Sequence, residues 1–143
     1  MTTRTERDFL GAREIPSDAY YGVQTQRGMD NFRITGVPMS AEPEFVRAFG
    51  YVKKAAALAN RDLKVLDAAV ADAIVVACDK LIAGEMRDQF LTDFIQGGAG
   101  TSTNMNANEV IANRALEILG HARGEYQYLH PNEHVNMSQS TND

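Results

Sequence analysis

The chain has 143 residues, of which 44% are hydrophobic and 23% are charged, and this is the composition of a globular domain. The net charge is −5, and the basic residues are scattered apart from the pair Lys53–Lys54, so a nucleic-acid partner is not expected. No apolar run approaches the roughly 18 residues of a membrane span, and the N-terminus has no apolar signal core. We therefore expect a cytoplasmic protein without a membrane partner.

Residues 1 to about 42 combine charges, glycines and prolines with short hydrophobic pieces. This pattern is typical of turns and a small β-hairpin rather than of long helices. We expect the two strands of the hairpin at residues 5–11 and 12–16. The rest of the chain, about 43–143, is predicted to be helical, and no linker or repeat divides it, so residues 1–143 are expected to form one domain.

Three helices are predicted from apolar residues at helical spacing. The first, near 43–60, begins at Pro43, which suits the first turn of a helix, and it repeats apolar residues at Phe45, Phe49, Val52, Ala56 and Ala59. The second, about 67–83, begins behind Asp67 as its N-cap and ends before Gly84. The second helix has an apolar face made of Val70, Ile74, Ala77, Cys78 and Leu81.

Cys78 lies inside the apolar pattern of the second helix, which indicates a buried structural thiol. The third helix runs from Thr101 or Thr103 to Leu119 and is closed by Gly120. Its predicted apolar side consists of Met105, Ala112, Ala115, Leu116 and Leu119. The fold class predicted from these elements is mainly α, with a short hairpin at the front.

The third helix begins with an unusual sequence, "GGAGTSTNMNAN", in residues 97–108. Four asparagines at positions 104, 106, 108 and 113 are a poor choice for a helix, because their amides compete with the backbone. A glycine turn, hydroxyls and the free N–H groups of a helix start could bind a carboxylate. The structural alternative is a glycine turn with redundant capping residues and asparagines that bond to neighbouring helices. A phosphate loop is disfavoured, since its lysine and its glycine spacing are missing.

A second polar cluster, "SQSTND" at residues 138–143, also has the residue types that cap a helix. Between the two clusters, "HPNEHVN" holds His130 and His134 at the spacing of a helical metal pair. Pro131 disfavours helical geometry at His130, however, and no third ligand is apparent, so a metal site is disfavoured. A hydrolase has little support, because no nucleophile elbow or Ser-His-Asp arrangement is present.

With both clusters considered, the chain resembles the aspartase/fumarase family of lyases over essentially its whole length. The similarity is carried by "DFLGAREIPSDAYYGVQTQR", "GGAGTSTNMNANEVIANRA" and "HPNEHVNMSQSTND". Fumarases typically read Gly-Ser-Gly-Thr-Gln where this chain has Gly98-Ala99-Gly100-Thr101-Ser102, and the form found here is the aspartase one. The segment "HPNE" is similar to the fumarase "HPND", so the fumarases remain the alternative within the family.

The resemblance implies a reversible deamination of L-aspartate to fumarate and ammonia, through abstraction of a C3 proton and an aci-carboxylate intermediate. It implies substrate-binding roles for Thr101, Ser140, Thr141 and Asn142, whose donors would stabilise the charge on the carboxylate. It also implies a secondary dicarboxylate site at His130, Asn132 and Glu133. No organic cofactor is implied, and activation by a divalent cation is left open.

The resemblance further implies parts of the enzyme that this sequence does not show. The catalytic base of the family is a serine on a mobile loop with the signature "SSxMPxKxN", which does not occur here. The family builds homotetramers around a central helical bundle and assembles each active site from three subunits. We therefore expect an N-terminal lyase domain that is inactive alone, with apolar surface exposed where the bundle would cover it. The alternatives from other classes are a self-contained dicarboxylate-binding module and a purely structural domain.

Overall fold

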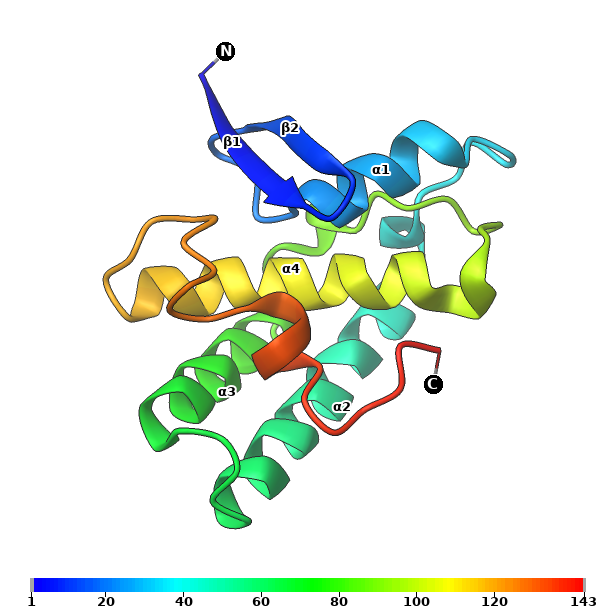
Figure 1. The fold of residues 1–143 in the computed structure, drawn as a ribbon. Coiled ribbons are helices and arrows are strands. Elements are labelled where there is room, and N and C mark those ends of the chain that lie inside the picture. Colours follow the sequence, from blue (N-terminus) through cyan, green and yellow to red (C-terminus); the bar gives the residue numbers. More distant parts are fainter. Residues whose placement is uncertain (1, 143) are drawn as a thin grey trace.

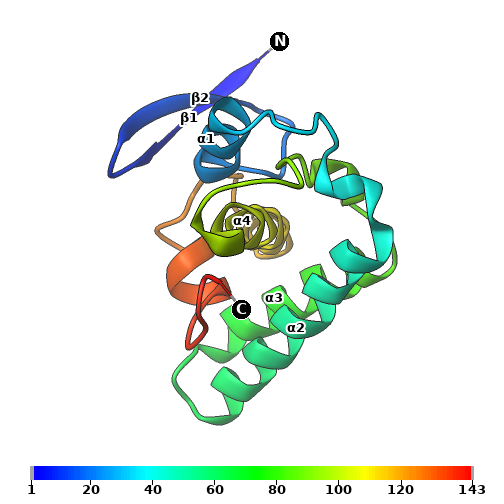
Figure 2. The ribbon, with the colours of Figure 1, turned by 90° about the vertical axis from the view of Figure 1, so that its right-hand side faces the viewer.

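A computed structural model describes residues 2–142 as a mainly helical structure with one small β-sheet (Figure 1). Helix α4 (Thr101–Ile118) runs through the middle. One side of it is covered by the hairpin of β1 (Thr3–Asp8) and β2 (Gly11–Pro16) together with helix α1 (Val23–Asn31). The other side is covered by helices α2 (Pro43–Asp62) and α3 (Ala68–Ile82), and Figure 2 shows the three layers with α4 nearly end-on.

The structure confirms a mainly α fold that starts with a hairpin, but it moves the strands. β1 and β2 are antiparallel, with Thr3 opposite Pro16 and Asp8 opposite Gly11. Residues 9–10 form the turn, whereas the sequence pattern had placed them in the first strand. The turn forms there because Asp8 accepts a hydrogen bond from Leu10 N at 2.9 Å and Gly11 adopts a φ of 112°, which only glycine tolerates easily.

Helix α1 lies in the stretch that the sequence pattern assigned to turns. It has no local side-chain cap, because its N-cap residue is Gly22. Its first N–H groups are capped by two carboxylates from distant elements instead. Glu6 of β1 accepts from Val23 N at 2.8 Å, and Glu109 of α4 accepts from Thr25 N at 2.8 Å. Glu6 and Glu109 supply acceptors for N–H groups that have no partner within the helix, so α1 depends on residues that its own sequence does not reveal.

Glycine is required at position 22 by the closeness of these two carboxylates. A Cβ atom there would lie 1.9 Å from Glu109 Oε2 and 2.5 Å from Glu6 Oε2. Both carboxylates are buried, and the hydroxyl of Tyr126 donates to Glu6 at 3.0 Å. The pair therefore joins β1, α1 and α4 at one buried point.

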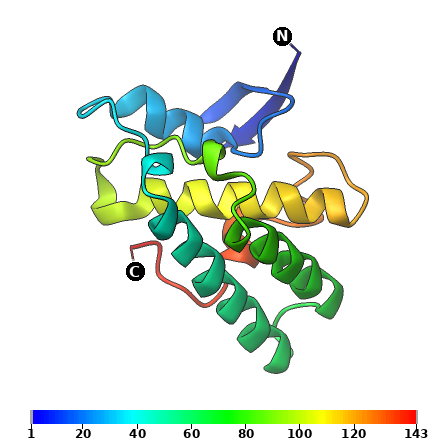
Figure 3. The same cartoon turned by 180° about the vertical axis from the view of Figure 1, so that it is seen from behind.

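Helices α2 and α3 form an antiparallel pair (Figure 3), and both were predicted within two residues of their observed ends. Pro43 occupies the first turn of α2, and Asp67 caps α3 by accepting from Ala69 N at 3.0 Å. Gly50 allows close packing, since a Cβ atom there would lie 2.7 Å from the Ile82 side chain. Cys78 is fully buried, as expected.

The buried face of α2 differs from its apolar repeat. The side that packs inward consists of Val46, Gly50, Lys53, Ala57 and Asn60. In the repeat, Phe45 is 48% exposed and Val52 is 56% exposed. Apolar surface is therefore exposed on α2, while a lysine and an asparagine are buried on its inner side. None of the helices within residues 2–142 is long and apolar enough to cross a membrane.

Candidate active site

The site begins at the turn that leads into α4. Gly98, Ala99 and Gly100 have φ values of 73°, 52° and 99°, so three residues in succession adopt left-handed conformations. Glycine accepts this conformation at little energetic cost, but Ala99 does not, and such backbone strain is typical of functional sites. The turn delivers Thr101 as the first residue of α4, with its hydroxyl 2.7 Å from Gly98 O.

The structure brings the two polar clusters of the sequence together at this point. The Thr101 hydroxyl donates to Asn142 Oδ1 at 2.6 Å, across 41 positions of sequence. Asn142 N in turn donates to Ser140 Oγ at 3.1 Å. We call Thr101, Ser140, Thr141 and Asn142 the hydroxyl–amide cluster. Ser140 and Asn142 are exposed and the other two are half-buried, so the cluster is open to a ligand.

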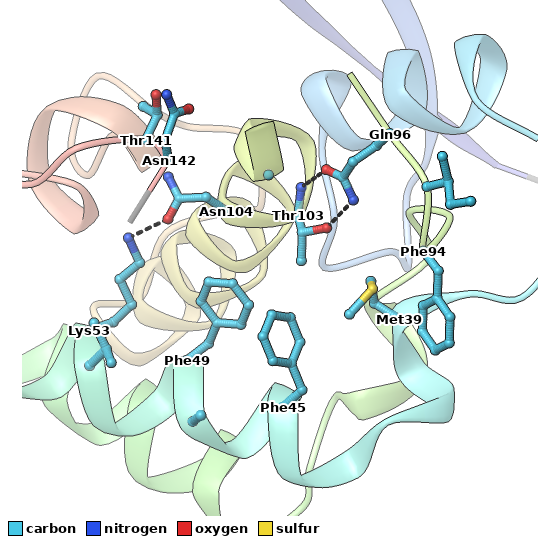
Figure 4. A pocket seen from close by; sticks show the side chains of 14 residues that line it. Met39, Phe45, Phe49, Lys53, Phe94, Gln96, Thr103, Asn104, Thr141 and Asn142 are labelled. Carbon is cyan, nitrogen blue, oxygen red and sulfur yellow. Dashed lines mark hydrogen bonds between the residues drawn. The ribbon is translucent and has the colours of Figure 1, made fainter. Parts of the chain in front are cut away.

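A cavity of about 650 Å³ lies beside the cluster, between α2, the start of α4 and residues 94–96. Figure 4 shows its apolar wall, to which Phe45 and Phe49 of α2 contribute, and the amides of Asn104 and Asn142 opposite. Gln96 orders the polar side, because its Oε1 accepts from Thr103 N at 2.7 Å and its amide also donates to the Thr103 hydroxyl. A mostly apolar cavity with a few fixed polar groups is the usual form of a small-molecule site.

Thr101 faces a second cavity of about 530 Å³, on the other side of the cluster. His130 and Asn132 line this cavity together with Arg7 and Glu109, whereas the exposed Glu133 is not part of its wall. The cluster therefore lies between two cavities, with Thr141 and Asn142 on the first and Thr101 on the second.

His130 serves as the cap of a short π-helical turn, η4 (Pro131–Val135). Its Nδ1 accepts from Asn132 N at 3.1 Å and from Glu133 N at 3.2 Å. Burial lowers the pKa of His130, so the ring is neutral at pH 7 and presents Nε2–H as a donor. His134 Nδ1 accepts from His130 N at 2.7 Å, which uses one ring nitrogen of the second histidine. Within residues 2–142 no three His, Cys, Asp or Glu side chains gather as metal ligands would.

The asparagines of α4 divide between two tasks. Asn106 and Asn113 bind loop backbone, since Asn106 Oδ1 accepts from Leu91 N at 2.9 Å and Asn113 Oδ1 accepts from Gly124 N at 2.8 Å. These two asparagines therefore have a structural role, as the alternative drawn from the sequence expected, but they bind loops rather than neighbouring helices. Asn104 and Asn108 instead face Asn136 near the cluster, with amide nitrogens 2.9 and 3.1 Å from Asn136 Oδ1.

Three residues that shape the site have no role predicted from the sequence, namely Lys53, Gln96 and Glu109. Lys53 is 2% exposed and donates to Asn104 and Asn136. Burial, followed by the nearby Glu6, raises the pKa of Glu109 to about 8. Only the adjacent pair Lys53–Lys54 in an apolar helix could have drawn attention, because successive residues of a helix point about 100° apart and the two lysines cannot face solvent in the same direction.

The comparisons with known proteins show the family of the chain. A family model described as "Lyase" matches residues 11–143. The chain belongs to this lyase family. It is 61% identical over 140 residues to an aspartate ammonia-lyase of Pseudomonas canavaninivorans, and 57% identical over 141 residues to that of Escherichia coli K12. Each match covers 98% of this chain and 30% of the relative, so this lyase-family chain spans about a third of the length of its curated relatives.

Solved structures show the same relationship. A structure described as fumarate lyase:delta crystallin from Brucella melitensis bound to cobalt matches with a TM-score of 0.97 and 58% identity. The match covers 99% of this lyase-family chain and 31% of the Brucella melitensis chain. The recombinant class II fumarase from Schistosoma mansoni matches with a TM-score of 0.90 and 36% identity, over 99% of this chain and 30% of that one. The fold is therefore the N-terminal part of the fumarate-lyase fold.

Proposed function

We propose that this chain supplies one part of the active site of an aspartate ammonia-lyase, which converts L-aspartate reversibly to fumarate and ammonia. The observation that carries the proposal is the hydrogen bond between Thr101 and Asn142, which joins the two polar clusters into one open site. Relatives named aspartate ammonia-lyase, 57–61% identical over nearly the whole chain, support it.

The chemistry fits the residues of the hydroxyl–amide cluster. Removal of the C3 proton of aspartate leaves negative charge on the neighbouring carboxylate, and fixed donors at those oxygens lower the barrier. The hydroxyls of Ser140 and Thr141 and the amide of Asn142 can act as such donors. The Thr101 hydroxyl, whose single proton goes to Asn142 Oδ1 in this structure, can do so once a substrate carboxylate replaces that acceptor. The positive end of the α4 dipole, at Thr101, favours the same charge. These residues bind and stabilise, and we assign the base to a part of the enzyme outside this chain.

The fumarase reaction, addition of water to fumarate, is the alternative within the family. Two observations favour deamination: the sequence Ala99-Gly100-Thr101-Ser102, and an identity of 61% to an aspartate ammonia-lyase against 36% to a class II fumarase. Fumarate takes part in both reactions, as the product of deamination and as the substrate of hydration, so the hydroxyl–amide cluster serves a dicarboxylate in either case.

We also propose a secondary dicarboxylate site in the second cavity, at His130 and Asn132. The neutral His130 ring offers Nε2–H as a donor, and Arg7, which lines the same cavity, supplies a positive charge. Glu133, which the sequence pattern included, lies outside the wall and would repel a carboxylate. Succinate binding that is weakened by Arg7→Ala, with the hydroxyl–amide cluster intact, would support this second site.

The full-length enzyme is proposed to be a cytoplasmic homotetramer. The exposed apolar residues of α2, including Phe45 and Val52, suit a surface that other helices cover. Light scattering of the full-length protein tests the assembly, since a monomer at micromolar concentration would contradict it.

The experiment that tests the function is an assay of the full-length enzyme with L-aspartate and L-malate in parallel. We expect fumarate to form from L-aspartate with release of ammonia, and L-malate to give no fumarate above a buffer blank. We expect the 143-residue chain alone to be inactive with both substrates. Fumarate formed only from L-malate would overturn the assignment in favour of a fumarase.

A further inference from the structure

A buried cation lies directly beneath the hydroxyl–amide cluster. Lys53 projects from α2 toward α4, as Figure 4 shows, and it is 2% exposed. Its ammonium donates to Asn104 Oδ1 at 2.7 Å, to Asn136 Oδ1 at 2.8 Å and to Gln139 Oε1 at 3.1 Å. An ammonium has three donors, so each N–H of Lys53 has one acceptor.

All three acceptors are neutral amides, so no carboxylate offsets the free-energy cost of removing the ammonium from water. Burial lowers the pKa of Lys53 to about 8, the direction expected when an ammonium leaves water without a carboxylate to balance it. An apolar side chain of the same length would fill the space without this penalty. A residue that breaks a local rule in this way often has a functional reason.

The three acceptors lie at the two halves of the site. Asn104 is one turn beyond Thr101 on α4, and Gln139 directly precedes Ser140. Asn136 holds the same segment together, since its Nδ2 donates to Gln139 O at 3.1 Å. One ammonium therefore connects the start of α4 to residues 136–139, which lead into Ser140, Thr141 and Asn142.

We propose that Lys53 is a positioning residue that fixes the segment 136–142 against the start of α4, and thereby holds Asn142 within reach of Thr101. The inference rests on the proposed function for its catalytic consequence, but the positioning itself is a property of the fold. A lysine suits the task because charge-assisted hydrogen bonds are about twice as strong as neutral ones, and its compact ammonium can reach three acceptors from one point.

The first test compares two substitutions in the full-length enzyme. Lys53→Met keeps the length of the side chain and removes all three donors, and we expect kcat/KM for L-aspartate to fall about 100-fold. The matched control is Lys54→Met, the next residue of α2, whose ammonium instead pairs with Asp79 at 2.6 Å near the surface. The control is expected to stay within about threefold of wild type. Equal activities of the two variants would overturn the proposal.

A double-substitution cycle separates positioning from a general loss of structure. If Lys53 acts by placing Asn142, then Lys53→Met should cost less than about threefold in an Asn142→Ala background, because there is no longer an amide to place. If Lys53→Met lowers kcat/KM by the same factor in the Asn142→Ala background as in wild type, the positioning role is contradicted. Should Lys53→Met fail to fold, Gln139→Met removes one acceptor from a half-buried position, and unchanged activity in that variant would overturn the proposal.

Hydrogen exchange tests the positioning without any reaction. In Lys53→Met we expect the amides of residues 136–142 to exchange at least about tenfold faster than in wild type, while α3 is unchanged. Unaltered exchange in that segment would refute the proposal. If wild-type enzyme turned over neither L-aspartate nor L-malate, the proposed function would fail while the exchange result still decided the role of Lys53.

Discussion

The substitution Glu109→Gln tests the buried carboxylate pair that caps α1. Glu109 is 1% exposed and lies beside Glu6, and it accepts hydrogen bonds from the backbone and the hydroxyl of Thr25. Burial, and then the charge of Glu6, raises the pKa of Glu109 from 4.5 to about 8. Glutamine has the same shape and keeps an oxygen for Thr25, but it carries no charge at any pH.

The direction of the effect follows from proton binding. Between pH 4.5 and about 8 the folded chain keeps the proton of Glu109, whereas the unfolded chain has released it. The free energy of unfolding therefore falls as the pH rises through this range. At 1.36 kcal/mol per pKa unit, a shift of this size corresponds to about 5 kcal/mol as an upper figure. The glutamine variant has no proton to release at this position, so its free energy of unfolding does not fall for this reason as the pH rises.

The assay is urea unfolding of wild type and Glu109→Gln at pH 5 and at pH 9. We expect the stability of the variant relative to wild type to increase by several kcal/mol, of the order of 3–5, between the two pH values. The matched control is Glu44→Gln, at an exposed position in the first turn of α2, which should change relative stability by less than about 0.5 kcal/mol. A stability difference between Glu109→Gln and wild type that is the same at both pH values would refute the reasoning.

Three further predictions concern buried groups outside the hydroxyl–amide cluster. Gly22→Ala should destabilise the chain by about 1–3 kcal/mol in urea unfolding, because its Cβ would meet Glu109 Oε2 at 1.9 Å; a wild-type midpoint would contradict the packing. Although burial raises the pKa of Asp93, hydrogen bonds from Ile95 N, Gly36 N and Thr35 lower it to about 2. The contribution of Asp93 to the free energy of unfolding should therefore be fully present above pH 4 and should decline between pH 4 and pH 2. Thermal melts of Asp93→Asn should lack this acid dependence. Burial raises the pKa of Cys78 to about 12, so a thiol reagent at pH 8 should label it only in urea, and rapid labelling of the folded chain would contradict its burial.

The long helices could be predicted from sequence because their signals are local. Pro43 in a first turn, Asp67 as a cap and Gly84 beyond a helix end act within a few residues of each boundary. The hairpin could be predicted as well, but the predicted turn was in the wrong place. The positive φ of Gly11 sets the position of the turn, and the pattern of apolar residues does not reveal it.

Other features could not be predicted, because they depend on partners far away in the sequence. α1 is capped by Glu6 and Glu109, so its own residues carry no start signal. The burial of Lys53 beneath an exposed apolar repeat contradicts the rule that apolar residues face inward, and only the fold reveals it. The same repeat is expected to face other helices in the proposed full-length enzyme.

For the candidate site, the sequence motifs suggest which residues bind substrate, and the fold shows which of them lie together. The two clusters are 41 positions apart at Thr101 and Asn142, and no local pattern states that they meet. Sequence composition also could not separate the two asparagines that bind loop backbone, Asn106 and Asn113, from those that surround Asn136. Each Asn has the same helix propensity, and only the groups that surround its side chain in the fold determine which hydrogen bonds it makes.

The most direct test of the central claim is kcat/KM of the full-length Thr101→Val enzyme with L-aspartate. Valine keeps the shape of Thr101 and removes the hydroxyl that lies 2.6 Å from Asn142 Oδ1. If this hydroxyl belongs to a site that stabilises the carboxylate, kcat/KM should fall by about 100- to 1,000-fold while the melting temperature changes little. A kcat/KM within about threefold of wild type would show that the hydroxyl–amide cluster is not where the reaction occurs.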